Sequence, residues 1–289
     1  MTTSVVPAGW LETTVNARGG IELATFEPIY PSMIDVATSK DNMFTPEDAP
    51  VVLGLHGFAA DSVVTWSRTR VIESLVKSGF RVILLDLRGH GRSGAPLDIS
   101  SYAITYFVSD IVDVLDAYSV NRVFLMGYSL GSVISLSAAT NPVFRERIQA
   151  VVAGGAGGRL LPNGSFHTLE SVAMAMEEAD ISAVTDKRAR AYRRFAEATG
   201  ADLRALALLQ RSLLGGVHID LGSIHIPTLV VAGRDDFVAG SPEELARQIL
   251  KGEWLQVPGN HMNALLNQSF ADGVSDFLLK QSYAQVDRT

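Results

Sequence analysis

Residues 127–131 read Gly-Tyr-Ser-Leu-Gly, and the fold can be worked out from this pentapeptide outward. The apolar run 122–126 precedes it and a helical pattern of small residues, 130–139, follows it. The order strand, sharp turn, helix puts Ser129 at the apex of the turn, and the flanking glycines permit that turn because a side chain at either position would crowd it. A serine hydroxyl is a poor nucleophile in water, so a turn that exposes it beside a free backbone N–H favours a nucleophilic serine over an ordinary glycine-flanked turn.

Short apolar runs recur along the whole chain, and most are continuous rather than alternating in polarity. Such runs are typical of strands buried on both faces of a parallel sheet. Helical patterns alternate with them, and Ser241-Pro-Glu-Glu244 marks one helix start, with an N-cap serine followed by proline. The alternation predicts an α/β fold with a doubly wound, mostly parallel sheet. The expected strands are 51–55, 81–85, 123–126, 148–153, 228–232 and 253–257, and the expected helices are 64–77, 102–118, 130–140, 242–250 and 263–280.

Two regions interrupt this rhythm. Residues 31–49 show little periodicity and are expected to form an insertion after an N-terminal hairpin at about 11–25. Residues 159–222 contain no good strand, and glycine- or proline-containing stretches lie at both ends. We therefore expect a core in two parts, 1–158 and 223–289, with a helical cap inserted at 159–222. The helical patterns of the cap cover 166–179, 187–198 and 201–214.

Composition excludes several classes of protein. A chain of 289 residues with 47% hydrophobic and 19% charged residues is not disordered as a whole. Its net charge of −7 argues against a nucleic-acid-binding surface, and the absence of cysteine excludes disulfides, thiolate nucleophiles and cysteine-ligated metals. We expect no signal peptide, and no apolar run approaches the ~20 residues that span a bilayer. A cytoplasmic protein is expected, whereas the oligomeric state is not indicated.

Candidate catalytic groups follow three of the predicted strands. In open parallel sheets, ligand sites form beyond the carboxyl ends of the strands, where Ser129 is expected. The loop after 228–232 reads Gly-Arg-Asp-Asp, and the loop after 253–257 ends in His261. An aspartate can orient the imidazole of His261, which can then take the Ser129 proton. On the residues alone, either Asp235 or Asp236 can be that aspartate.

Two further loops are expected at the same edge of the sheet, beyond the carboxyl ends of the strands. His56-Gly57-Phe58 follows the strand at 51–55, so the backbone N–H of Phe58 can pair with that of Leu130 to form an oxyanion hole, although a glycine turn with a core phenylalanine is the simpler alternative. The loop Asp-Leu-Arg-Gly-His-Gly-Arg-Ser follows the next strand at 86–93. We expect Asp86, His56 and His90 to brace these loops through hydrogen bonds.

Taken together, these pieces resemble the α/β-hydrolase fold family, specifically its single-domain members with a helical cap. The resemblance covers about 12–280, with 31–49 as a departure, and it makes 159–222 the cap. It implies that Ser129, Asp236 and His261 form a catalytic triad, because the family spacing from Gly233 selects Asp236. Relatives that open epoxides or dehalogenate carry aspartate at the elbow, which Ser129 replaces here. The matching motifs are His-Gly-Phe at 56–58, the loop at 86–93, Gly-Tyr-Ser-Leu-Gly at 127–131, Gly-Arg-Asp-Asp at 233–236 and Asn-His at 260–261.

The resulting hypothesis is a serine hydrolase that cleaves a carboxylic ester, or a related acyl bond, of a small molecule through an acyl-enzyme on Ser129. No metal spacing is present, and the glycine-rich run at 154–158 does not have the Gly-x-Gly-x-x-Gly pattern of a dinucleotide loop, so no cofactor is expected. A carbon–carbon bond hydrolase and an acyltransferase would use the same triad and remain open. A ligand-binding receptor of this fold with little turnover also remains open.

The substrate is not encoded in any readable motif. Tyr128, Met174 and Met176 are the candidate pocket residues, although the methionines can equally pack within the cap. The basic stretch from Lys187 to Arg194 is interpreted as a solvated helix face, with a landing site for a carboxylate as the alternative.

Overall fold

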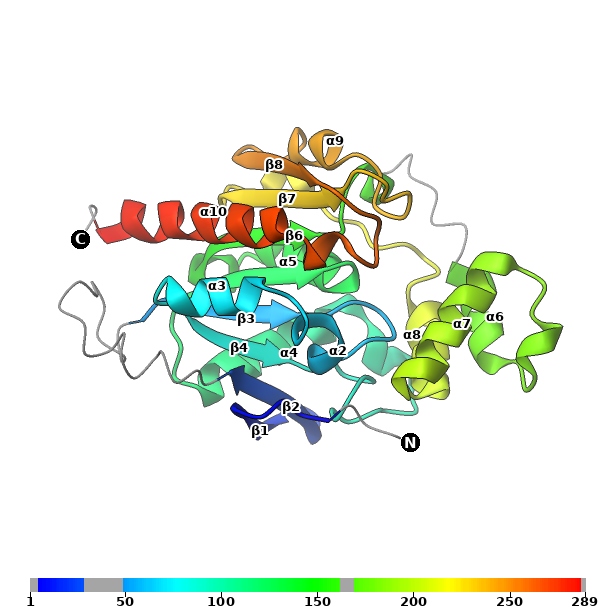
Figure 1. Cartoon of the computed structure of the whole chain (residues 1–289). Coiled ribbons are helices and arrows are strands. Elements are labelled where there is room, and N and C mark those ends of the chain that lie inside the picture. The colour runs from blue at the N-terminus through cyan, green and yellow to red at the C-terminus, as the bar shows by residue number, and fades with distance from the viewer. Residues whose placement is uncertain (1–4, 29–48, 162–168, 287–289) are drawn as a thin grey trace.

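The computed structural model of the chain describes residues 5–28, 49–161 and 169–286, so nearly all of the expected insertion at 31–49 lies outside the described residues. An eight-stranded sheet in the order β1-β2-β4-β3-β5-β6-β7-β8 forms the centre (Figure 1). Strands β3 to β8 are parallel, while β1 and β2 form an antiparallel hairpin that joins the sheet beside β4. The doubly wound, mostly parallel sheet predicted from the sequence is therefore confirmed. The strands are β1 (Trp10–Ala17), β2 (Ile21–Pro28), β3 (Val51–Leu55), β4 (Arg81–Leu85), β5 (Val123–Tyr128), β6 (Ile148–Gly154), β7 (Thr228–Gly233) and β8 (Gly252–Val257).

The central strands are almost wholly buried, as their continuous apolar sequences indicate. Every residue of β3, β5 and β7 is buried, and β4 and β6 have one partly exposed residue each. Among the parallel strands, β8 is the exception: it lies at the sheet edge, and Trp254 is 48% exposed. An edge strand pairs on one side only, so its sequence need not be apolar throughout.

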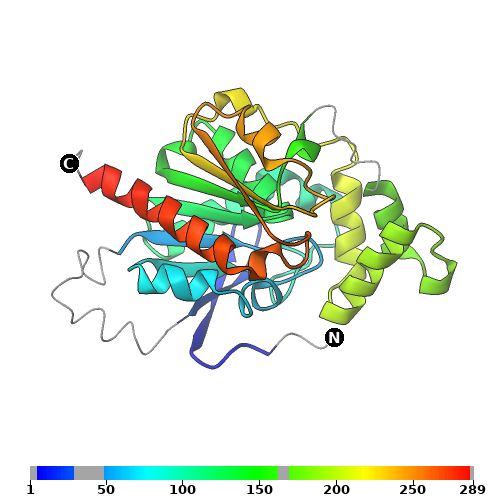
Figure 2. The ribbon, with the colours of Figure 1, turned by 45° about the horizontal axis from the view of Figure 1, so that its top comes forward.

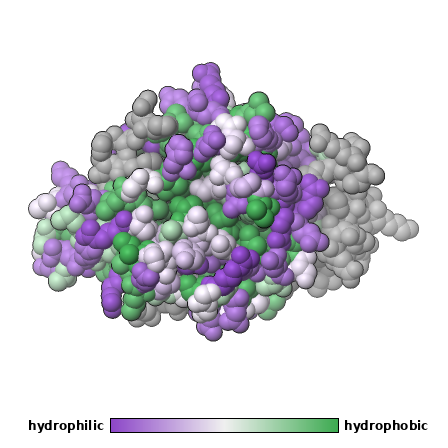
Figure 3. Space-filling view, turned by 180° about the vertical axis from the view of Figure 1, so that it is seen from behind, coloured by the Kyte–Doolittle hydropathy of each residue, from purple (hydrophilic) through white to green (hydrophobic). Residues whose placement is uncertain are grey.

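Helices cover both faces of the sheet (Figure 1). One core cluster joins α3 and α10 to one face, and the other joins α4, α5 and α9 to the opposite face. From behind, the surface shows apolar side chains interspersed with polar ones (Figure 3). Within the described ranges, no helix combines the length and hydropathy needed to cross a membrane. The helices are α2 (Ser62–Trp66), α3 (Val71–Lys77), α4 (Ile104–Ala117), α5 (Leu130–Thr140), α9 (Pro242–Ala246) and α10 (Gln268–Val286).

Three predicted helices differ from the structure. The final one, predicted at 263–280, is a 3-10 turn (Ala264–Leu266) followed by α10 (Gln268–Val286). The pattern at 64–77 is two helices, because the chain leaves the helix after Trp66, whose carbonyl accepts hydrogen bonds from both the backbone and the side chain of Thr69. The helix predicted at 242–250 ends at Ala246, since the chain must turn back into β8. At that turn a Cβ on Gly252 would lie 2.1 Å from the carbonyl oxygen of Ala246.

Three helices lie between β6 and β7, beyond the carboxyl ends of the strands (Figures 1 and 2). They are α6 (Leu169–Glu177), α7 (Lys187–Thr199) and α8 (Leu203–Ser212). Asp186 and Asp202 cap the N-termini of α7 and α8, and Gly200 ends α7 in the left-handed conformation. The helices themselves match the sequence expectation, whereas their grouping as a separate cap domain stays a prediction.

The loop after β4 is anchored by a buried ion pair. The guanidinium of Arg88 donates to both carboxylate oxygens of Asp110 on α4, at 2.7 and 2.5 Å, and also to the carbonyl of Ser101. Their side chains are only 4% and 2% exposed. A pair this deeply buried is stable only while both charges are present.

We therefore expect Asp110→Asn to lower the free energy of unfolding by about 3–5 kcal/mol, because it leaves the Arg88 charge buried and unpaired. Urea denaturation measures the change. Glu73→Gln is the matched control, since the Glu73–Lys77 pair is 51% and 62% exposed. Glu73→Gln should lower the free energy of unfolding by less than about 1 kcal/mol. Equal losses for the two variants would contradict this interpretation.

Candidate active site

The turn between β5 and α5 holds Ser129 in an unusual backbone conformation. Its φ of 54° and ψ of −111° lie in a region that residues other than glycine rarely adopt. The turn is crowded: a Cβ on Gly127 would lie 2.2 Å from the carbonyl oxygen of Gly131, and one on Gly131 would lie 2.2 Å from that of Leu55. The N–H of Ser129 donates to Gly154 at 2.8 Å and ties the turn to β6. Both glycines of the pentapeptide are thus required by close backbone contacts.

Ser129, His261 and Asp236 form a continuous hydrogen-bonded chain. The Ser129 Oγ lies 3.0 Å from Nε2 of His261. The Nδ1 of the same ring lies 2.9 and 3.1 Å from the two carboxylate oxygens of Asp236. These residues come from the loops after β5, β8 and β7, so three segments far apart in the sequence meet at one edge of the sheet.

The two adjacent aspartates are held differently. Asp236 is 4% exposed, and its Oδ1 accepts hydrogen bonds from the N–H groups of Val238 and Ala239. Asp235 is exposed, and its N–H donates to Gly259 at 2.9 Å. Only Asp236 therefore contacts the imidazole, while the backbone of Asp235 holds the two loops together.

The N–H groups of Phe58 and Leu130 donate to no acceptor within the described part of the chain. The segments that carry them are adjacent: the N–H of Gly131 donates to the carbonyl of His56 at 3.1 Å. A Cβ on Gly57 would lie 3.4 Å from the Cβ of Ser129. Two free donors are thus available close to the Ser129 side chain.

Buried polar residues brace the loops below this site. His56 accepts from the N–H of Leu87 at Nε2, and its Nδ1 lies 2.8 Å from the Gly57 carbonyl. Asp86 accepts from the N–H groups of Ser62 and Arg92. His90 packs its ring against that of Phe58, with centroids 6.2 Å apart. Burial lowers the pKa of His90 to about 3, so this imidazole is neutral in the fold at ordinary pH.

Helix α7 contacts the loop after β3. The Tyr192 ring meets that of Phe58 edge-on at 6.0 Å, and the Thr199 hydroxyl donates to the Ala59 carbonyl at 2.7 Å. Neither residue was found from the sequence, because a helical pattern does not reveal which strand-end loop a helix covers. Met176 is buried among α6, α7 and α8, whereas Met174 is 58% exposed, so their role in a substrate pocket stays a prediction.

The basic stretch on α7 is in part structural. Arg193 is 6% exposed and donates to the carbonyls of Ala175 and Glu178, and Arg190 donates to the carbonyl of Val184. These two cations therefore hold the helices together and do not face a ligand. Lys187, Arg188 and Arg194 are exposed, as a solvated face requires.

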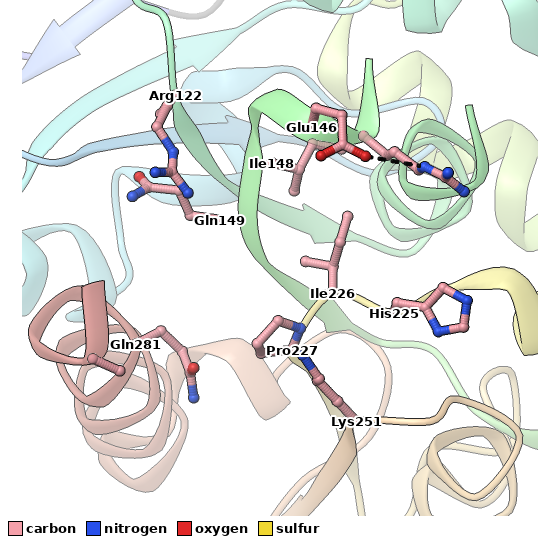
Figure 4. A pocket seen from close by; sticks show the side chains of 11 residues that line it. Arg122, Glu146, Ile148, Gln149, His225, Ile226, Pro227, Lys251 and Gln281 are labelled. Carbon is pink, nitrogen blue, oxygen red and sulfur yellow. Dashed lines mark ion pairs between the residues drawn. The ribbon is translucent and has the colours of Figure 1, made fainter. Parts of the chain in front are cut away.

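A pocket of about 480 Å³ lies at the opposite edge of the sheet, near the start of β6 and β7 (Figure 4). Ile148, Ile226 and Pro227 lie in its middle, with Arg122 and Lys251 around them. Both cations are exposed and hence solvated, so their charges alone do not make a binding site. Among the residues that the structure describes, no three His, Asp or Glu side chains are grouped to hold a metal ion.

A family model described as alpha/beta hydrolase fold matches residues 50–180. An epoxide hydrolase from Caballeronia sordidicola is 35% identical over 107 residues, which are 36% of this chain and 32% of that protein. A putative 2-succinyl-6-hydroxy-2,4-cyclohexadiene-1-carboxylate synthase from Bacillus subtilis is 36% identical over 107 residues, 37% of this chain and 36% of that one. The matches thus span about a third of these curated relatives.

Solved structures match almost the whole chain at lower identity. The enol-lactonase from Burkholderia xenovorans superposes with a TM-score of 0.69 at 20% identity, covering 92% of this chain and 99% of that one. An esterase from Exiguobacterium antarcticum has a TM-score of 0.72 at 18% identity and coverages of 93% and 100%. Similarity at this level of identity shows a common fold.

The buried imidazole of His90 makes stability depend on pH. Its pKa is lowered to about 3 by burial, whereas an unfolded chain binds the proton below about pH 6.5. The unfolded state therefore binds more protons between these values, and this residue contributes a loss of up to about 1.4 kcal/mol of stability per unit of acidification. The slope of unfolding free energy between pH 6 and about pH 4.5 should be shallower in His90→Gln. The exposed His218 provides the control, because His218→Gln should keep the wild-type slope. A wild-type slope in His90→Gln would refute this origin.

Proposed function

We propose that this chain, a member of the α/β-hydrolase fold family, is a serine hydrolase that cleaves a carboxylic ester or related acyl bond of a small molecule. One observation carries the proposal: the hydrogen-bonded chain from Ser129 through His261 to Asp236 at the edge of the sheet. A serine next to an oriented imidazole is the arrangement that activates a hydroxyl for attack on a carbonyl.

In the proposed reaction, Ser129 Oγ attacks the carbonyl carbon of the substrate while His261 Nε2 takes the hydroxyl proton. The carbonyl π electrons move to oxygen, and the N–H groups of Phe58 and Leu130 stabilise that oxyanion. The carbon–oxygen bond to the alcohol then breaks, and the alcohol leaves with the proton from the imidazolium. An acyl group remains on Ser129.

Water completes the cycle by the same route. His261 removes a proton from a water molecule, which attacks the acyl carbon. The second oxyanion then collapses, the bond between the acyl carbon and Ser129 Oγ breaks, and Oγ takes the proton from the imidazolium as the carboxylic acid is released. Asp236 accepts a hydrogen bond from Nδ1 in both halves, which keeps Nε2 free to accept protons and stabilises the imidazolium. The bonds from Val238 and Ala239 hold the carboxylate of Asp236 in place for this task.

The epoxide hydrolases among the relatives suggest another reaction, but the chemistry of Ser129 disfavours it. A carboxylate that opens an epoxide forms an ester, which water can cleave. A serine hydroxyl that opens an epoxide would form an ether, which this site has no means to cleave. Ester cleavage is therefore the better proposal, and the resemblance to an enol-lactonase and an esterase in fold agrees with it.

We expect Ser129→Ala to reduce turnover of a panel of acyl esters of graded chain length by about 10⁴-fold or more, while the protein stays folded. A fluorophosphonate probe should label Ser129 in the wild type. Ser137→Ala is the matched control, because among the described residues the Ser137 hydroxyl bonds only to the Val133 carbonyl within α5. It should keep activity within about twofold, since the lost bond, worth about 1 kcal/mol of stability, involves none of the catalytic groups.

The same experiment separates the other candidate functions. Activity of Ser129→Ala within tenfold of wild type would contradict the proposal that Ser129 is the nucleophile. Fast labelling with negligible ester turnover would favour a receptor. Turnover that appears only with an added acceptor alcohol would indicate an acyltransferase, and turnover of a diketone without that of esters would indicate a carbon–carbon bond hydrolase.

The choice of acid gives a second prediction. Asp236→Asn replaces the charged acceptor of Nδ1 with an amide, so the wrong tautomer is favoured and the imidazolium loses its stabilising charge. We expect kcat to fall by up to about 10⁴-fold. The exposed Asp235 makes no contact with the ring, so Asp235→Asn should change kcat by less than about tenfold. If Asp235→Asn were the variant with the large loss of kcat, the roles of the two residues would be reversed.

A further inference from the structure

Tyr128 contacts both the backbone and the ring of His261. It directly precedes Ser129 but is only 5% exposed, and its hydroxyl donates to the backbone carbonyl of His261 at 2.6 Å. Its ring lies beside the imidazole, with centroids 5.6 Å apart, and also packs edge-on against Phe270, with centroids 6.2 Å apart. Burial raises the pKa of Tyr128 far above its ordinary value, so the hydroxyl keeps its proton and remains a donor.

Gly155 completes the surroundings of the imidazole. It follows β6 with a φ of +60°, and its N–H donates to Val231 at 2.8 Å. A Cβ at this position would lie 3.0 Å from Cζ of Tyr128 and 3.1 Å from Cε1 of His261. Such contacts are tighter than ordinary van der Waals distances, so only glycine leaves the imidazole and the phenol ring where they are.

These contacts anchor the His261 backbone, which the hydrogen bonds of the triad do not hold. The bonds at Nδ1 and Nε2 fix the direction of the imidazole, but they do not anchor the backbone that carries it. The loop around His261 is also held by the Asp235 N–H, which donates to Gly259 at 2.9 Å, and by the Asn260 N–H, which donates to the Asn263 side chain at 2.7 Å. Neither of these bonds involves the His261 backbone or β5. The Tyr128 hydroxyl links this backbone directly to β5, the strand that also presents Ser129.

We propose that Tyr128 and Gly155 are positioning residues that set the imidazole of His261 against Ser129. Tyr128 anchors the His261 carbonyl, and Gly155 leaves room for the edge of the ring. The inference deepens the proposed hydrolase function and rests on it. Neither residue touches the reacting atoms, so both act through His261.

The first test is Tyr128→Phe, which keeps the ring and removes one hydrogen bond. With the best ester of the panel, kcat should fall about fivefold, the factor for one neutral hydrogen bond, while KM stays within about twofold. Tyr283→Phe is the matched control, because Tyr283 is 48% exposed on α10. It should change neither constant.

The second test is Gly155→Ala, whose new methyl group must displace the imidazole or the phenol ring. We expect kcat to fall by about 10–100-fold, because a misplaced catalytic group is costly even at small displacements. Gly20→Ala is the control for backbone strain: Gly20 has a φ of +76° with no atom within 4 Å of its Cβ position. Both variants should lose stability, but only Gly155→Ala should lose kcat.

A spectroscopic readout separates this inference from the proposed function. The Nδ1–H proton of His261, hydrogen-bonded to Asp236, can be followed by NMR whether or not any ester is turned over. We expect its signal to shift or to exchange faster with water in Tyr128→Phe and Gly155→Ala, and not in the two controls. An unchanged signal with unchanged kcat in both variants would overturn the inference. A wild type that turns over no ester, with the signal still perturbed in the variants, would defeat the proposed function and leave the positioning role standing.

Discussion

The close approach of the start of α5 to β3 is the constraint on which the site depends. A Cβ atom on Gly127 or on Gly131 would lie 2.2 Å from a backbone carbonyl oxygen. The turn is therefore possible only because both residues lack a side chain. The positive φ of Ser129 is the strain that this geometry stores, and such strain persists only when the surroundings over-determine it. The N–H bond from Ser129 to Gly154 and the hydroxyl bonds from Ser132 to Gly127 and Gly154 provide that support.

Rigid elements carry the groups that need accurate positions. Ser129 follows β5 directly, Asp236 follows β7, and His261 is tied back to β5 through Tyr128. Preorganised groups of this kind need little rearrangement when charge develops during a reaction, which is the main electrostatic advantage of an enzyme site. Gly155 fits this arrangement, because a Cβ at that position would lie 3.1 Å from Cε1 of His261.

The histidines of this chain divide by burial. His56 and His90 are buried and held neutral by the cost of desolvating a charge, so they brace the loops around Phe58. His261 is 14% exposed at its side chain and faces both a hydroxyl and a carboxylate. Burial and hydrogen-bond partners therefore distinguish His261 from the two buried histidines.

The sequence by itself determined the parallel sheet, the elbow at Ser129 and the order serine, aspartate, histidine, because buried strands, glycine turns and strand-end loops each leave a local pattern. It left Asp235 and Asp236 equivalent on the residues alone, since adjacent residues share every local signal. The spacing in the related family selected Asp236, and the tertiary structure shows that this carboxylate contacts His261. Tertiary structure alone decided that Tyr128 turns inward to His261 and that Gly155 borders the imidazole. It also decided that Arg193 is buried between α6 and α7, where it donates to carbonyls at the end of α6. These outcomes depend on contacts between strands and helices distant in sequence, and no local pattern encodes such contacts.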